Sequence, residues 1–192
     1  MAQILPKHIY IILTIFLFSL LIEGESEKFA KSLSPKLLHL KKEKLTHLHF
    51  YWHDIFSGEH PTKVTVVKTV DNTTKTFFGA VSVLDDALRV GPGANSKIVG
   101  RAQGMYVASN QKNYSIVMAM SFEFTEGEYN GSTLSVLGSN LVALPKREVP
   151  IVGGSGLFRF SSGYAIIKTY KFIPTVFAIM EMDFYVLHYG DS

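Results

Sequence analysis

The chain of 192 residues contains no cysteine. A protein without thiols forms no disulfide bond, so it must be held together by a hydrophobic core or by oligomerisation. The same absence excludes thiol catalysis, thiolate metal sites and thiol redox roles. The length suits one domain and is short for two. Hydrophobic residues make up 47% of the sequence, which is enough for a sizeable core.

A large excess of charge is also missing. The net formal charge is +3 at pH 7, and much of the positive charge lies in the segment EKFAKSLSPKLLHLKKEKLTH, before the first convincing strand. Such segments are usually solvated extensions of a domain, so we interpret residues 25–46 as an N-terminal extension. A nucleic-acid interface would need basic residues interleaved with exposed aromatics on a folded surface. We therefore expect no nucleic-acid partner.

The one long hydrophobic run lies at the N-terminus. Residues 9–22 read IYIILTIFLFSLLI, with Lys7 before them and EGES after them. A positive residue, a short apolar run and small residues near a cleavage point are typical of a secretory signal peptide. The run is short for a membrane span, which needs about 20 residues. We predict that residues 1–24 are a signal peptide and that the mature protein is secreted; a retained signal anchor is the alternative.

Three Asn-X-Ser/Thr sequons agree with secretion. They begin at Asn72, Asn113 and Asn130, and each fits N-glycosylation in a secreted chain. The pair Asn130-Gly131 also lies between two alternating runs, which is a strong hairpin signal. Both interpretations of Asn130 can hold because a hairpin turn is exposed.

From His47 onward the sequence reads as strands separated by turns. The run HLHFYWHD alternates, with Phe50, Trp52 and Asp54 on one face and the histidines on the other. No later stretch shows a clear helical period. Roughly eight strands predict an all-β fold, a closed eight-stranded antiparallel barrel or a sandwich, over residues 47–192. A barrel of about eight strands can hold one small ligand.

Two kinds of site are not predicted. The stretch GGSG follows a strand, but no Lys-Ser/Thr completes a phosphate loop. The seven histidines are scattered, and none has the spacing of a metal-ligand cluster. We therefore expect neither a metal nor a cofactor. The pair Asp85-Asp86 is expected to shape a turn toward Gly91-Pro92.

Five blocks in the mature chain resemble the plant dirigent protein family. They are FYWHDI at 50–55, VGRAQGMY at 99–106, EYNGSTLSVLGSN at 128–140, REVPIVGGSGLFRFSSGYA at 147–165 and YVLHY at 185–189. Their order and spacing make the resemblance specific. It implies a secreted, eight-stranded antiparallel barrel that forms a homo-oligomer, a trimer in most of the family, with a dimer as the alternative.

The resemblance also implies a function. Dirigent proteins bind phenoxy radicals or quinone methides and impart stereoselectivity on phenylpropanoid coupling, giving lignan-type products from substrates such as coniferyl alcohol. A separate oxidase, a laccase or a peroxidase, supplies the radicals. Relatives called pterocarpan synthases instead remove water from an isoflavanol and close a ring through a quinone methide. A non-catalytic, phenolic-binding protein of the cell wall is the third alternative, so whether the chain is an enzyme stays open.

Three residues match the catalytic positions of the family. Asp54 matches a pocket aspartate, Tyr106 a pocket tyrosine and Arg147 an arginine at the pocket mouth. A carboxylic acid or a phenol can protonate a quinone methide oxygen, and an arginine can hold negative charge without losing its proton. The alternatives are a turn-capping role for Asp54, a rim position for Tyr106 and a surface salt bridge with Glu148 for Arg147.

Asn140, Phe50 and Arg101 are the further substrate-binding candidates. Arg101 could instead be a structural arginine buried in a barrel strand. Asn140 occupies the position where pinoresinol-forming members usually carry an aspartate, and an amide cannot act as an acid. Ser139 and Ser161-Ser162 also depart from the family pattern. These departures argue against pinoresinol as the product and leave a phenolic ligand in place.

Overall fold

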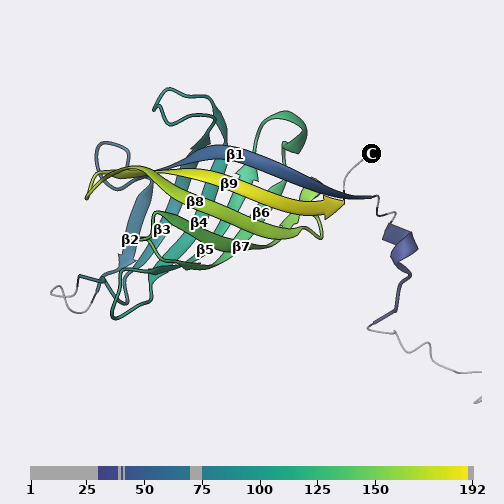
Figure 1. Ribbon diagram of the computed structural model, residues 1–192, viewed down its shortest axis with the longest axis horizontal. Helices are drawn as coiled ribbons and strands as arrows, with labels where there is room; N and C mark the ends of the chain where they lie inside the picture. The colour runs from purple at the N-terminus through teal and green to yellow at the C-terminus, as the bar shows by residue number, and fades with distance from the viewer. Residues whose placement is uncertain (1–29, 39, 41, 70–74, 190–192) are drawn as a thin grey trace, which may run out of the picture. The chain divides into compact units, whose positions relative to one another are not determined.

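The structure is a computed structural model that describes residues 30–38, 40, 42–69 and 75–189 (Figure 1). The predicted signal peptide and the sequon at Asn72 lie outside the described residues. In the N-terminal unit, one short 3-10 helix, η1 (Pro35–Leu38), is described. Within the described ranges, no helix is long and apolar enough to cross a membrane.

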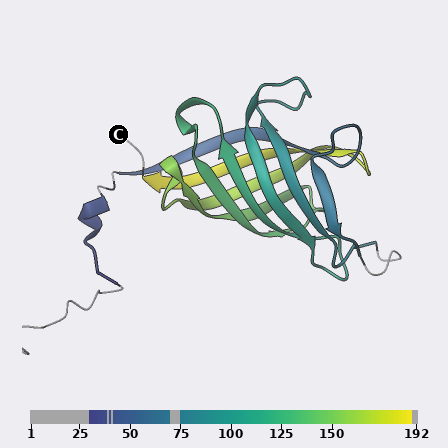
Figure 2. The same cartoon turned by 180° about the vertical axis from the view of Figure 1, so that it is seen from behind.

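The barrel unit is built almost entirely from antiparallel strands (Figures 1 and 2). The described strands are β1 (Glu43–Ile55), β2 (Lys63–Val67), β3 (Val81–Arg89), β4 (Ile98–Ala108), β5 (Ile116–Phe124), β6 (Thr133–Asn140), β7 (Lys146–Ser155), β8 (Ser162–Ile173) and β9 (Phe177–Tyr189). Their order in the sheet is β1-β9-β8-β7-β6-β5-β4-β3-β2. Two further 3-10 helices, η2 (Gly127–Tyr129) and η3 (Gly156–Phe158), lie in the connections.

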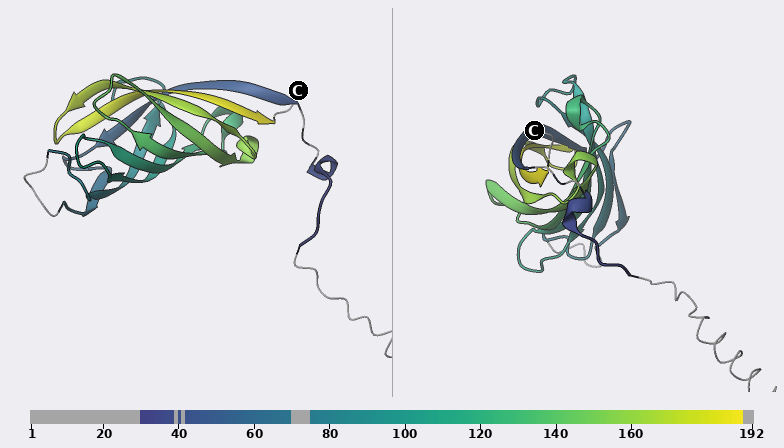
Figure 3. Two further views of the ribbon diagram at one scale, coloured as in Figure 1. Left: turned by 60° about the horizontal axis from the view of Figure 1, so that its bottom comes forward. Right: turned by 90° about the vertical axis from the view of Figure 1, so that its right-hand side faces the viewer.

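β1 closes the sheet into a barrel. It pairs with β9 over its whole length, and Tyr51, Trp52 and His53 also pair with the end of β3. The closed ring therefore has eight strands, β1 and β3 to β9, which the right-hand view of Figure 3 shows from one end. β2 lies outside this ring and extends the sheet beside the first half of β3. The prediction of an eight-stranded antiparallel barrel is confirmed.

Alternation along the strands decides what the barrel encloses. β1 buries Phe50, Trp52 and Asp54, whereas His47 and His49 remain on the outer face, as the sequence pattern predicts. The hairpin predicted around the Asn-Gly pair is also present, because β5 and β6 pair along their length on either side of it. Asn130 is exposed in this turn, and Asn113 is exposed in the connection between β4 and β5.

An aromatic cluster fills the middle of the barrel. The rings of Phe50, Phe122 and Phe184 have centroids 4.9 to 6.1 Å apart and pack at steep angles. Each fully buried ring contributes about 1.5–3 kcal/mol through loss of apolar surface. In a chain without disulfides, this cluster supplies much of the stability.

Glycines allow the strands to approach closely where the barrel curves. A Cβ atom on Gly163 would collide with the carbonyl oxygen of Tyr185, and one on Gly104 with that of Ala119. Both glycines also have φ angles, +155° and +147°, that residues with side chains rarely adopt. The curvature at these two points therefore depends on glycine.

Candidate functional site

A cavity of about 440 Å³ opens at one end of the barrel. Its volume is in the range of small-molecule sites, and most of its wall is apolar or aromatic. β2, β3, β4, β5 and the end of β8 contribute to it, together with Phe56, which directly follows β1. The lining residues that matter below are Phe56, Lys63, Tyr106, Tyr114, Ile116 and Phe172.

Asp54 lies inside the barrel next to this cavity. β1 carries it on the same face as Trp52, and only 4% of its surface is exposed. The hydroxyl of Tyr106 lies 3.5 Å from Asp54 Oδ2, a long hydrogen bond, while Oδ1 has no partner. Burial raises the pKa of Asp54 to about 8, and the neighbouring carboxyl of Asp86 adds to the effect. At neutral pH Asp54 is therefore mostly uncharged and can donate a proton.

A second buried acid, Asp86, lies on β3. Trp52 Nε1 donates a hydrogen bond of 2.6 Å to Asp86 Oδ2, and burial raises the pKa of Asp86 to about 7. The prediction that Asp85-Asp86 shapes a turn is wrong, because both residues lie within a strand. The alternation in VSVLDDAL was the missed signal: every second residue of this run is buried, and Asp86 is one of them.

Lys63 brings a cation to the cavity. Its Nζ lies 3.8 Å from the ring centroid of Phe56 and 5.7 Å from that of Tyr106. Burial lowers the pKa of Lys63, while the charges of Asp54 and Asp86 oppose this change. The sequence did not predict a role for Lys63. It begins a run of β-branched residues, and such a run does not indicate which end of a barrel the strand covers.

Tyr106 remains a proton donor in this setting. Burial raises its pKa, and Asp54, once it is ionised at higher pH, raises it further. The cavity wall thus offers a phenol that keeps its proton, beside a carboxylic acid that is mostly protonated. Such a pair can hydrogen-bond a phenolic oxygen and can protonate it when that oxygen gains electron density.

Arg147 also faces the interior, from β7. It is 5% exposed, and Nη1 donates to the carbonyl oxygen of Leu144 at 3.0 Å and to Thr169 Oγ1 at 2.8 Å. Its Nε has no partner. The alternative of a surface salt bridge with Glu148 does not fit, because Arg147 is buried and makes no ion pair with any residue in the described part of the chain. A buried guanidinium held by neutral oxygens keeps its charge available to an anion.

Asn140 ends β6 on the inner face and is 5% exposed. Its Nδ2 donates to Met118 Sδ at 3.3 Å, and its Oδ1 has no partner. It pairs across the strands with Ile116, which lines the cavity. Asn140 and Arg147 make no hydrogen bond to Asp54 or Tyr106, so they belong to a different part of the interior wall.

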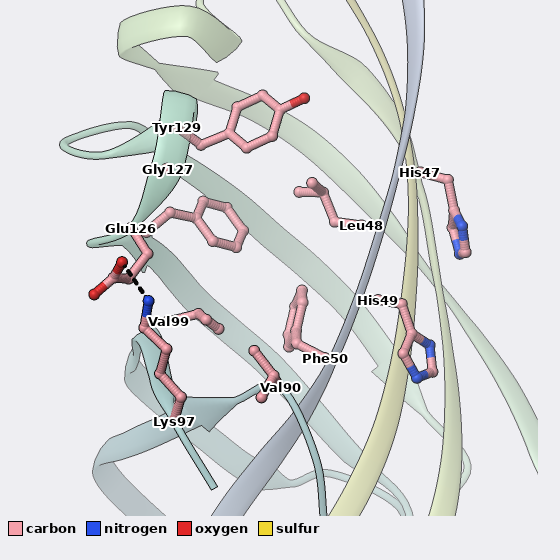
Figure 4. Close-up of a pocket in the computed structure, with 11 residues that line it drawn as sticks. His47, Leu48, His49, Phe50, Val90, Lys97, Val99, Glu126, Gly127 and Tyr129 are labelled. Carbon is pink, nitrogen blue, oxygen red and sulfur yellow. Dashed lines mark hydrogen bonds and ion pairs between the residues drawn. The ribbon is translucent and has the colours of Figure 1, made fainter.

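The last two candidates lie elsewhere. Arg101 points to the outer face of β4, where it bonds the side chain and the carbonyl oxygen of Asp85, so it is not buried in a strand. Phe50 belongs to the aromatic core and to a second cavity beside the first half of β1, with Leu48 and Tyr129 (Figure 4). Neither residue lines the cavity next to Tyr106.

Comparisons with known proteins agree with this fold. The family model described as Dirigent-like protein matches residues 45–187. Dirigent protein 7 of Arabidopsis thaliana is 44% identical over 188 residues, which cover 96% of this chain and 100% of the relative. Pterocarpan synthase 1 of Glycyrrhiza echinata is 43% identical over 173 residues, or 88% of this chain and 92% of the relative.

A solved structure gives the same result. The pterocarpan synthase dirigent protein GePTS1 superposes with a TM-score of 0.78 at 44% identity, covering 84% of this chain and 100% of that one. The family model spans the barrel from β1 to β9. This chain therefore belongs to the dirigent-like protein family.

Proposed function

We propose that this chain binds a phenolic quinone methide, or the phenoxy radicals that give rise to one, in the cavity beside Tyr106. There it determines the face on which the new bond forms. The observation that carries the proposal is the position of Asp54: a carboxyl group that is buried in the barrel and bonded to the tyrosine that lines the cavity, with a pKa raised by burial. A positioned acid that keeps its proton near neutral pH can protonate the oxygen of a quinone methide.

The proton transfers are simple in this proposal. A nucleophile adds to the exocyclic carbon of the quinone methide, the electron pair moves to the carbonyl oxygen, and that oxygen becomes a phenol. Asp54 or Tyr106 donates the proton to this oxygen. The nucleophile, a hydroxyl group or water, loses a proton that restores the acid. The apolar walls supplied by Ile116 and Phe172 orient the intermediate and limit access of water.

In the first version, the quinone methide follows radical coupling. A separate laccase or peroxidase oxidises a phenylpropanoid such as coniferyl alcohol, and the barrel imparts stereoselectivity on the coupling without oxidising anything itself. The amide of Asn140 cannot replace the second acid of pinoresinol-forming members. We therefore propose a lignan-type product other than pinoresinol. The predicted signal peptide would bring the chain to the same compartment as such oxidases.

A second candidate is a dehydratase, which the protonated state of Asp54 specifically favours. Asp54 would give its proton to the leaving hydroxyl of an isoflavanol, and the carbon–oxygen bond would break with release of water. The substrate's phenol would lose a proton as the quinone methide forms, which would restore Asp54. A second phenolic hydroxyl would then close the ring. The relative named as Pterocarpan synthase 1, at 43% identity, and the solved structure of a pterocarpan synthase dirigent protein, at 44% identity, support this version.

Two assays separate the versions. The first incubates coniferyl alcohol and a laccase with and without the protein and resolves the products by chiral chromatography. An enantiomeric excess that grows with protein concentration supports stereoselective coupling, and a racemic product at every concentration rules it out for this substrate. The second incubates isoflavanol stereoisomers with the protein and no oxidase. Ring closure there requires an enzyme.

Failure of both assays would leave the third alternative. If phenols still quenched the fluorescence of Trp52, the only tryptophan, the chain would be a passive phenolic-binding protein of the cell wall. Saturable quenching by a phenol, measured on a chain that is inactive in both assays, would therefore show binding without catalysis.

A further inference from the structure

Four potential metal ligands meet on the outer face of the barrel, away from the cavity beside Tyr106. β1 presents His47 and His49 on the face opposite to Leu48 and Phe50, as Figure 4 shows. Across the strand pair, His49 lies directly opposite Asp183 of β9. Glu181, two residues before Asp183, points to the same face because side chains alternate along a strand.

The donor atoms converge on one carboxylate. Asp183 Oδ1 accepts hydrogen bonds from His47 Nε2 and from His49 Nδ1, each at 2.9 Å. One donor atom from each of His49, Glu181 and Asp183 lies within 4.8 Å of the other two. In a tetrahedral zinc site, ligand distances of about 2.0–2.1 Å place the donor atoms roughly 3.4 Å apart. Small side-chain rotations would therefore bring these three groups around one ion.

A cation already occupies the neighbouring space. Lys168 Nζ, from β8, lies 2.9 Å from Glu181 Oε1 and 3.5 Å from Asp183 Oδ2. The two carboxylates thus favour a positive charge between them. Because the Lys168 side chain is partly exposed and long, it can move into solvent when an ion with two charges takes this position.

We propose that His49, Asp183 and Glu181 bind a divalent transition-metal ion of the Zn²⁺ class on the outer face of β1 and β9, with His47 as a neighbouring fourth donor. Imidazole and carboxylate are the ligand types that such ions prefer. The ring of His47 stacks on that of Tyr185 at 4.7 Å, which holds it at the edge of the site. The ion would join the first strand of the barrel to the last, and this role does not depend on the function proposed for the cavity.

The test uses the full chain, expressed for secretion without a polyhistidine tag and freed of metal by dialysis against EDTA. Titration with ZnCl₂ in a calorimeter should show one Zn²⁺ per chain with micromolar affinity. Zn²⁺ should also raise the melting temperature, because an ion that binds only the folded state stabilises it. No binding by the wild-type chain would overturn the proposal.

Variants locate the ion. His49→Ala and Asp183→Asn should each weaken Zn²⁺ binding about tenfold or more, whereas Lys168→Met should strengthen it by roughly threefold to tenfold, because a competing charge is removed. His60→Ala is the matched control, since His60 is exposed in a loop and, among the described residues, its ion pair is with Glu59, at 3.9 Å. Equal binding by His49→Ala and His60→Ala, or no gain in Lys168→Met, would contradict the site.

Discussion

The middle of the barrel and its cavity end bury very different side chains. The aromatic middle, Phe50, Phe122 and Phe184, is apolar and closely packed. The polar end, which we define as Asp54, Asp86, Asn140 and Arg147, leaves one buried polar atom without a partner on each residue. These are four of the six such atoms found on the described residues.

This difference separates stability from chemistry. A buried polar atom without a partner costs about 1–3 kcal/mol of stability, so the four atoms together lower the stability of the fold considerably. Folded proteins keep such groups where a ligand completes their hydrogen bonds or where a reaction uses them. The aromatic middle offsets this cost, and the two regions should therefore respond in opposite ways to substitution.

Asp54→Asn should have the largest effect on activity. The amide keeps the shape of the side chain but cannot donate a carboxylic proton, so turnover or stereoselectivity should fall about 100-fold or more. The melting temperature should stay the same or rise. Asp85→Asn, on the outer face one residue before Asp86, is the matched control for the loss of a carboxylate. Unchanged turnover in Asp54→Asn would remove the acid role.

Phe184→Ala should have the largest effect on stability. Phe184 is fully buried, and removing its ring leaves a cavity that costs about 3–5 kcal/mol. Urea denaturation measures the loss. Leu187→Ala, on the same strand but 37% exposed, should cost less than about 1 kcal/mol. Equal losses of stability in the two variants would mean that the aromatic middle does not contribute more to stability than an exposed position on the same strand.

Much of this comparison could be predicted from local sequence. The alternation in HLHFYWHD places Asp54 and Trp52 on the buried face, and the family blocks lead to Tyr106. Arg101 could have been excluded in the same way, because residues five apart in one strand point to opposite faces, and Tyr106 faces inward. Asp86 was missed because an Asp-Asp pair suggests a turn, although the strand period was present around it.

Pairing between distant strands could not be predicted. His49 and Asp183 are 134 residues apart in the sequence and meet only because β1 pairs with β9 in one register. The expectation of no metal site rested on the spacing of histidines along the chain. Such spacing cannot predict contacts between residues on strands that are distant in sequence. Likewise, the sequence does not reveal that Asp54 and Asp86 share one interior, because the closure of β1 against β3 brings them together.

The pH dependence of stability should reveal the raised pKa of Asp54 at the polar end. Asp54 has a pKa of about 8 in the folded chain, above its unfolded value, so the folded state binds more protons. Stability from this group is complete below the unfolded pKa, falls above it by up to about 1.4 kcal/mol per pH unit, and is lost once the pH has risen through 8. Asp54→Asn should therefore gain stability relative to the wild type between pH 6 and pH 9.

Urea midpoints measured across this range for both proteins give the combined titration of Asp54 and its neighbour Asp86, whose carboxyl adds to the raised pKa of Asp54. Buried histidines, such as His53, whose pKa is lowered by burial, contribute equally to the two chains and cancel. Curves that stay parallel from pH 6 to pH 9 would mean that Asp54 is already charged at neutral pH. The proposed proton donor would then have to be Tyr106 or Asp86.

Asn140→Asp should have the smallest effect on rate and should instead change the product. A carboxyl group there would add a second acid near Met118, on a wall with no hydrogen bond to Asp54, so turnover should stay within about threefold, or roughly 0.7 kcal/mol. The ratio of stereoisomers should shift, because the strand partner Ile116 lines the cavity. Chiral chromatography measures this ratio, with Ser139→Asp, one residue earlier on the opposite face of β6, as the control. The same product ratio in both variants would exclude Asn140 from the wall that the intermediate touches.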